Sequence, residues 1–161
     1  MTSTLIETTP AAAAPDRLYW EDFPAGLVLE FGSITMTREA IVRFATEFDP
    51  QAFHIDDSAA EKTLFGGLIA SGWHTASTAM RMMCDAYLLR SSSLGSPGME
   101  NLKWLQPVRP GDTLRMRLTV LESRLLRSKP GIGLMRGQHE VINQRGEVVM
   151  EMCGSGMFGV R

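Results

Sequence analysis

Asp49 and His54 are the two side chains of this sequence whose types and spacing best suit proton chemistry. They stand in the segment FDPQAFHIDD, on either side of an uncharged spacer, PQAF. Carboxylates and imidazoles are frequent proton donors and acceptors in catalysis. A chain turn at Pro50 would aim both groups at one small volume, where together they could hold and deprotonate a water molecule.

A helix must place Asp49. From Thr37, a favourable N-cap, apolar residues recur at helical spacing with charged residues on the opposite side; the apolar set is Ala40, Ile41, Phe44, Ala45 and Phe48. Because the residue before a proline avoids helical backbone, Pro50 predicts that this helix ends near Phe48 or Asp49. A carboxylate at the negative end of the helix dipole is disfavoured, so we expect the pKa of Asp49 to be raised.

Two shorter elements flank this region. A strand is predicted over residues 27–35, and it is entered through a Pro-Ala-Gly turn. After the His54 segment, Ser58 and Glu61 have the spacing of a capping box and predict the start of a short helix. Asp56 is expected to be a turn or cap residue rather than a catalyst.

A second, longer helix is predicted from Gly72 to about Leu89, with Ser71 as its cap. It is apolar on nearly every side, which predicts a buried helix; one side comprises Trp73, Ala76, Met80, Met83, Cys84 and Tyr87. Backbone N–H groups at a helix start are fixed donors at the positive end of the dipole. Gly72 lacks a side chain and would let a reacting oxygen approach them closely.

The chain changes character after these helices, and four segments are typical of strands: 100–108, 112–126, 131–143 and 146–160. The second alternates polar residues with an apolar set, as a half-buried strand does; the set is Leu114, Met116, Leu118 and Val120. NQRG, 143–146, predicts a hairpin turn, and short turns between successive segments imply antiparallel pairing. The predicted fold class is α+β, with a curved antiparallel sheet wrapped around the long central helix.

Composition limits the classes of function. The 161 residues fit one domain, 44% of them are apolar and 21% charged, and the net charge of -2 gives no strong pull toward nucleic acid or a membrane surface. No apolar run is long enough to span a bilayer. The two cysteines form neither a disulfide framework nor a metal-binding cluster, so a reducing, cytoplasmic setting is expected. Residues 1–17 are predicted to be a flexible tail without the features of a signal peptide, and residues 18–161 the domain.

Three motifs in order now carry a resemblance. DPQAFHID, FGGLIASGWHTAS and PVRPGD match the hydratase motif, the glycine run entering the central helix and the inter-strand turn of MaoC-like dehydratases. The chain thus resembles the (R)-specific enoyl-CoA hydratase type of this family, which has a single hotdog fold, over roughly residues 18–160. Two residues depart from the family motif, because Gln51 replaces an Asn and Ala52 a Pro. Ser71 stands where many relatives have His.

The resemblance implies a cytoplasmic acyl-CoA hydratase/dehydratase that reversibly adds water to a trans-2-enoyl-CoA and gives an (R)-3-hydroxyacyl-CoA. It assigns Asp49 and His54 as the catalytic pair, and Gly72, Ser71 and Gln51 as candidate oxyanion or substrate-binding residues. The substrate is the coenzyme A thioester, and neither a metal nor another cofactor is expected. The resemblance also implies a homodimer, or a multiple of dimers, with the two sheets joined edge to edge and the site near the subunit interface.

Other interpretations stay open. A hotdog acyl-CoA thioesterase would direct water at C1 instead of C3, and a non-catalytic acyl-thioester-binding module would bind without turnover. A hydratase for a branched or dicarboxylic enoyl-CoA is a third. A nucleophilic pair of Ser71 and His74 is rejected, because both belong to one helical turn and do not face each other. Trp104 and Met99 could line an acyl tunnel, but core packing is the preferred prediction. Arg109 could contact a CoA phosphate, but a solvated turn residue is the preferred prediction.

Overall fold

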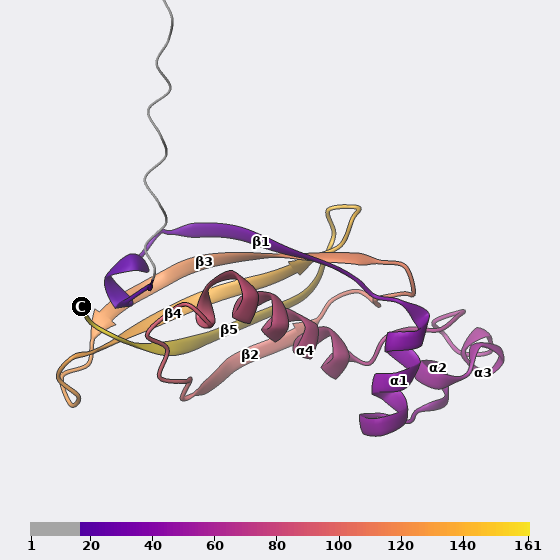
Figure 1. Ribbon diagram of the computed structural model, residues 1–161. Helices are drawn as coiled ribbons and strands as arrows, with labels where there is room; N and C mark the ends of the chain where they lie inside the picture. The colour runs from indigo at the N-terminus through magenta and orange to yellow at the C-terminus, as the bar shows by residue number, and fades with distance from the viewer. Residues whose placement is uncertain (1–16) are drawn as a thin grey trace, which may run out of the picture.

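In the computed structural model, which describes residues 17–161, one curved antiparallel sheet wraps around a long helix (Figure 1). The predicted tail, residues 1–17, lies outside the described residues except for Arg17, and the domain boundary stays a prediction. Five strands follow one another across the sheet: β1 (Val28–Thr35), β3 (Thr113–Leu125), β4 (Ile132–Ile142), β5 (Val148–Gly159) and β2 (Gly98–Trp104). Sheet and helix together make the predicted α+β class and the hotdog fold.

The predicted pairing of successive strands is confirmed for β3, β4 and β5 but is wrong for β2. This strand pairs with β5 at the far edge, where Trp104 lies opposite Met150, and not with β3. The expected strand 100–108 also ends early, at Trp104. Pro107 has no N–H to donate, and the carbonyl of Val108 instead accepts a hydrogen bond of 2.8 Å from Ala70. The Leu105 and Gln106 N–H groups still bond to the Val149 carbonyl of β5, at 2.8 and 3.2 Å, and from Val108 the segment is attached to the residues just before the long helix.

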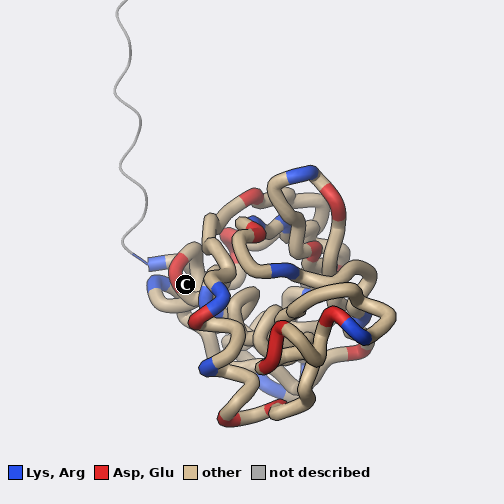
Figure 2. The backbone as a smooth tube through the Cα atoms, turned by 90° about the vertical axis from the view of Figure 1, so that its right-hand side faces the viewer, with Lys and Arg blue, Asp and Glu red and all other residues tan. Residues whose placement is uncertain are grey.

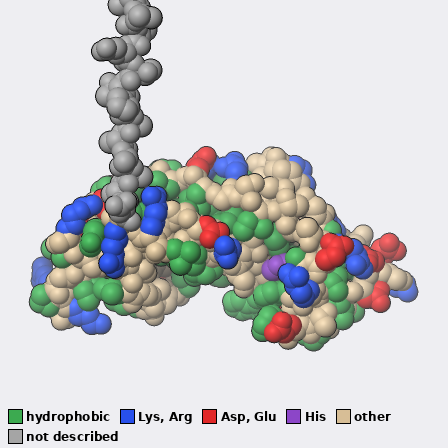
Figure 3. Space-filling view, in the orientation of Figure 1, with side chains coloured by type: hydrophobic (Ala, Val, Ile, Leu, Met, Phe, Trp, Pro, Cys, Tyr) green, Lys and Arg blue, Asp and Glu red, His purple; other side chains and the backbone are tan. Residues whose placement is uncertain are grey.

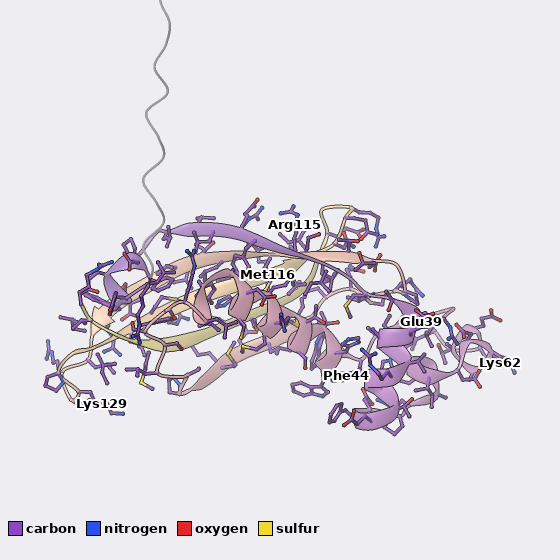
Figure 4. All side chains as sticks on the ribbon, viewed as in Figure 1. Glu39, Phe44, Lys62, Arg115, Met116 and Lys129 are labelled. Atoms are coloured by element: carbon purple, nitrogen blue, oxygen red, sulfur yellow. The ribbon has the colours of Figure 1, made fainter. Side chains whose placement is uncertain are left out.

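The core lies between the sheet and α4 (Gly72–Met83). The alternation predicted in β3 is confirmed, because Leu114, Met116, Leu118 and Val120 are all buried. Met116 lies between the sheet and α4 (Figure 4). The predicted NQRG turn connects β4 and β5, and it is closed by a hydrogen bond of 3.0 Å from the Gly146 N–H to the Asn143 carbonyl.

The prediction that the central helix is buried all round is wrong. One sheet covers only one side of α4, and the buried residues are Thr75, Thr78, Ala79, Met82 and Met83. Trp73 and Met80, expected on a buried face, are 60% and 49% exposed. The helix also changes form near its end, where Cys84–Leu88 make a π-helical turn and the Leu89 N–H bonds to the Cys84 carbonyl at 3.1 Å. No described helix is both long enough and apolar enough to cross a membrane.

Three short helices lie together at the end of the molecule where α4 begins: α1 (Arg38–Phe48), α2 (Ala52–Ile55) and α3 (Asp57–Glu61) (Figure 1). Thr37 caps α1 as predicted, accepting a hydrogen bond of 3.2 Å from the Ala40 N–H. The capping box expected for α3 is wrong, because Asp56, and not Ser58, accepts the cap hydrogen bond, from the Ala59 N–H at 2.8 Å. Asp56 is thus the cap residue that the sequence suggested. Basic and acidic residues are interspersed along the backbone of this end (Figure 2).

Candidate active site

The structure brings Asp49 and His54 into direct contact, with His54 Nε2 3.3 Å from Asp49 Oδ2. Asp49 is the C-cap of α1, and its N–H bonds to the Ala45 carbonyl at 2.8 Å. Pro50 ends α1, and the chain then turns into α2, which carries His54 inward. The predicted turn at Pro50 is therefore confirmed, and the helix end lies where it was expected.

A backbone contact fixes the tautomer of His54. Its Nδ1 lies 2.7 Å from the carbonyl oxygen of Ile69. A carbonyl can only accept, so Nδ1 carries a hydrogen, and in the neutral ring the lone pair is on Nε2. This lone pair is on the nitrogen that contacts Asp49. A water molecule bound by the two side chains could therefore donate one hydrogen to Nε2 and the other to Oδ2.

Both carboxylate oxygens of Asp49 accept hydrogen bonds. Gln51 Nε2 donates to Oδ1 at 2.7 Å, and Ser71 Oγ donates to Oδ2 at 2.7 Å. Burial raises the pKa of Asp49, but the hydrogen bonds from Ser71 and Gln51 and the nearby His54 outweigh it, and the pKa lies below its ordinary value. The expectation of a raised pKa is therefore wrong. The two donated hydrogen bonds, which the sequence pattern did not show, help to outweigh the effect of burial.

A pocket of about 480 Å³ opens beside the pair. Its polar members are Asp49, Gln51, His54, Thr75 and Gln106, and the rest of its wall is mostly apolar and aromatic, with Phe53, Phe65, Ile69, Ala70, Gly72, Trp73, Trp104, Leu105, Pro107 and Val108. Of the predicted site residues, Asp49, His54, Gly72 and Gln51 line it. Ser71 is fully buried behind Asp49 and is not on the pocket wall.

Gly72 is the first residue of α4, so its N–H lacks a partner within the helix. No acceptor for it is found among residues 17–161. A free backbone donor at the positive end of a helix and on a pocket wall is the arrangement that an oxyanion requires. The role of Gly72 as an oxyanion donor stays a prediction.

From sequence, Trp104 could line an acyl tunnel, but core packing is the preferred prediction. It is 45% exposed and lines the pocket, so its assignment to the core is wrong. Its Nε1 donates to the Gly72 carbonyl at 2.9 Å, and it packs edge-on against Trp73 with ring centroids 5.2 Å apart. Met99, also assigned to the core, is exposed. No local pattern reveals these contacts, because the partner of Trp104 lies far away in the chain.

The remaining candidates have other contacts. The His74 ring stacks on Phe44 at 4.7 Å, while the Ser71 hydroxyl donates to Asp49, so the rejected nucleophilic pair is not formed. Figure 4 shows Phe44 on the α1 side that faces the start of α4. Arg109 is half-buried, not solvated as expected, and donates to the Phe65 carbonyl at 2.6 Å. Within residues 17–161, no three His, Cys, Asp or Glu side chains are grouped as a metal ion would require.

The chain is similar to known proteins in sequence and in fold. The family described as "MaoC like domain" matches residues 24–140. An uncharacterized protein of Bacillus subtilis, YdeM, is 31% identical over 112 residues, which are 70% of this chain and 79% of that protein. The crystal structure of a MaoC-like dehydratase from Rhodospirillum rubrum is 39% identical, with a TM-score of 0.82 over 89% of this chain and 98% of the other.

The (R)-hydratase from Pseudomonas aeruginosa, at 22% identity and a TM-score of 0.71 over 90% of this chain and 88% of the other, shares the fold. The matched residues 24–140 include Asp49, His54 and Gly72, and thus the whole pocket wall described above. The chain therefore belongs to the MaoC-like domain family.

Proposed function

We propose that this protein is an acyl-CoA hydratase/dehydratase that reversibly adds water to a trans-2-enoyl-CoA and gives an (R)-3-hydroxyacyl-CoA. The observation that carries the proposal is the Asp49–His54 contact of 3.3 Å at the wall of a mostly apolar pocket. The names of the relatives support it, since the Rhodospirillum rubrum protein is described as a MaoC-like dehydratase. The chemistry needs no metal or redox cofactor, because the pair supplies both the base and the acid.

The proposed step adds the elements of one water. The water oxygen attacks C3 of the enoyl group while one of its protons passes to the pair, and a proton passes from the pair to C2. The lowered pKa of Asp49, in which hydrogen bonds outweigh burial, keeps this carboxyl ionised and able to accept. The contact between Oδ2 and Nε2 lets a proton move from one side chain to the other, so the pair can be reset without bulk water. The Gly72 N–H would stabilise the thioester oxygen as it gains negative charge.

We also propose a homodimer, or a multiple of dimers, joined edge to edge through the sheet. Strand β2 is an edge strand and carries the exposed apolar side chains Met99 and Trp104, and Trp73 on the pocket wall is exposed as well. Hydrophobic side chains gather at the surface where α4 begins, beside α1 (Figure 3). A second copy would cover this surface. Cys84 and Cys153 are free, which supports a cytoplasmic location.

The deciding experiment follows the loss of enoyl-thioester absorbance with crotonyl-CoA for wild type and Asp49→Asn. Hydration by the wild type and a loss of about a hundredfold or more in the variant would support the proposal. Release of free thiol from acyl-CoA would instead identify a thioesterase. Tight acyl-CoA binding without turnover of crotonyl-CoA or of longer and branched enoyl-CoAs would identify a binding module.

A further inference from the structure

We infer that Ser71 is a positioning residue, whose hydroxyl fixes the Asp49 carboxylate relative to the helix end that carries the Gly72 N–H. The inference rests on the proposed function, because the proposed hydration needs the Asp49 carboxylate and the Gly72 N–H held at a fixed distance from each other. Ser71 is not proposed to touch the substrate, since it is fully buried and lies off the pocket wall.

One oxygen atom makes both connections. Ser71 Oγ donates its only hydrogen to Asp49 Oδ2 at 2.7 Å, and it accepts the Trp73 N–H at 3.3 Å as the cap of α4. The first contact reaches the end of α1 and the second the first turn of α4. Two elements far apart in sequence, one with the proposed base and one with the proposed oxyanion donor, thus share a single hydrogen-bonding atom.

The backbone around Ser71 holds this atom in place. The Ser71 carbonyl accepts the Thr75 N–H at 3.1 Å, and the Ala70 N–H donates to the Val108 carbonyl at 2.8 Å. The hydroxyl is thereby fixed between the helix and the segment after β2. Gln51 holds the opposite oxygen of Asp49 at 2.7 Å, so the carboxylate is held from two sides and presents Oδ2 to His54.

Loss of the Ser71 hydroxyl should change the chemistry of Asp49 and not merely loosen the fold. A half-buried carboxylate that loses one donated hydrogen binds a proton more tightly. Its orientation is then fixed only by the Gln51 amide, and small errors in the placement of catalytic groups lower rates strongly. The expected signature is therefore a change in the pH profile together with a loss of rate.

The experiment uses three variants of the full chain. Ser71→Ala removes both contacts, whereas Ser71→Gly removes the bond to Asp49 but keeps a residue that is tolerated at an N-cap. Thr37→Ala is the matched control, since Thr37 caps α1 in the same way and lies at the opposite end of that helix from Asp49. For each we would measure stability, the pH dependence of kcat/KM for hydration, and the titration of the Asp49 carboxyl carbon by NMR, with Asp49→Asn to assign the signal.

Both Ser71 variants should lower kcat/KM by about 10- to 100-fold. The midpoint of the acid side of the pH profile and the midpoint of the Asp49 NMR titration should both move up by about one pH unit. Thr37→Ala should keep the wild-type pH profile. The inference is overturned if the Asp49 titration of both Ser71 variants coincides with that of the wild type, even when activity falls. If the wild type hydrates no enoyl-CoA, the proposed function fails, but the NMR titration still decides the role of Ser71.

Discussion

The indole Nε1 of Trp104 donates a hydrogen bond of 2.9 Å to the carbonyl oxygen of Gly72. The ring also occupies the space where a side chain on Gly72 would stand, since an added Cβ would lie 2.4 Å from the nearest ring carbon. The glycine is therefore required by its packing against Trp104. The same pair forms the wall of the pocket beside Asp49 and His54.

Gly72→Ala should displace the indole and lower hydration activity by about tenfold or more, because the pocket wall and the helix start would both move. A double variant that also carries Trp104→Leu removes the clash and should recover stability. Chemical unfolding of the two single variants and the double variant measures this coupling. Additive losses, with no interaction energy beyond about 0.5 kcal/mol, would show that the two residues are independent.

Trp104→Leu should alter the choice of substrate more than the fold. The indole is partly exposed and forms one side of the pocket, so the smaller side chain leaves room for a longer or branched acyl group. We expect the ratio of kcat/KM for octenoyl-CoA to that for crotonyl-CoA to rise, by about tenfold. Met99→Leu, on the same strand but off the pocket wall, is the control and should keep the wild-type ratio.

Ala52→Pro should stabilise the protein by about 0.4–1 kcal/mol. Ala52 is the first residue of α2, where proline is favoured, and its N–H donates no hydrogen bond within residues 17–161. Gln51 before it has φ -74° and ψ 141°, the extended form that a residue before proline prefers. Urea unfolding would measure the gain. Ala59→Pro, which removes the N–H that bonds to Asp56 at 2.8 Å, should instead destabilise.

His139→Phe should make the fold more resistant to acid. Burial lowers the pKa of His139 from 6.5 to about 4, so the folded state keeps the ring neutral where the unfolded state binds a proton. Stability from this residue is full above pH 6.5 and falls as the pH drops through 6.5 toward 4. Between pH 6.5 and 4 the wild type should lose about 1–3 kcal/mol of unfolding free energy through this residue, and His139→Phe should not show this loss.

Unfolding free energies at pH 7 and pH 4.5 would show this difference. Tyr87→Phe is the control, because it removes only the hydroxyl that lies 3.4 Å from His139 Nε2 and leaves the buried imidazole in place. An equal loss of stability in wild type and His139→Phe over this range would contradict the prediction.

Periodicity and turn chemistry were enough to predict the elements of the fold. The alternation around Met116 placed β3, and Thr37 and Pro50 fixed both ends of α1. The predictions that were wrong concern contacts between residues distant in sequence. β2 pairs with β5 because of how the whole sheet is ordered, and nothing within 100–108 encodes this.

In the candidate site too, local features were predicted correctly and long-range contacts were not. The motif spacing brought Asp49 and His54 together correctly, and Ser71 was correctly predicted as the cap of α4. The predicted direction of the Asp49 pKa shift was wrong, because the hydrogen bonds from Ser71 and Gln51 and the nearby His54 outweigh burial, and the Ser71 bond comes from a different helix end. Trp104 was misassigned for a related reason, since the exposure of a tryptophan depends on which surfaces the other elements leave open.

The π-helical turn at Cys84–Leu88 ends the central helix, so it lies at the opposite end of that helix from Ser71 and Gly72. A π turn contains one residue more than the α turn it replaces, and residues of an α-helix are spaced about 100° apart around the axis. Deleting one residue here would rotate the preceding and following side chains against each other and turn Tyr87 away from Phe23, Phe31 and His139. Ser71 and Gly72 lie before the turn. A change of length at this turn would therefore disturb the packing of Tyr87 but leave the spacing of Ser71 and Gly72 unchanged.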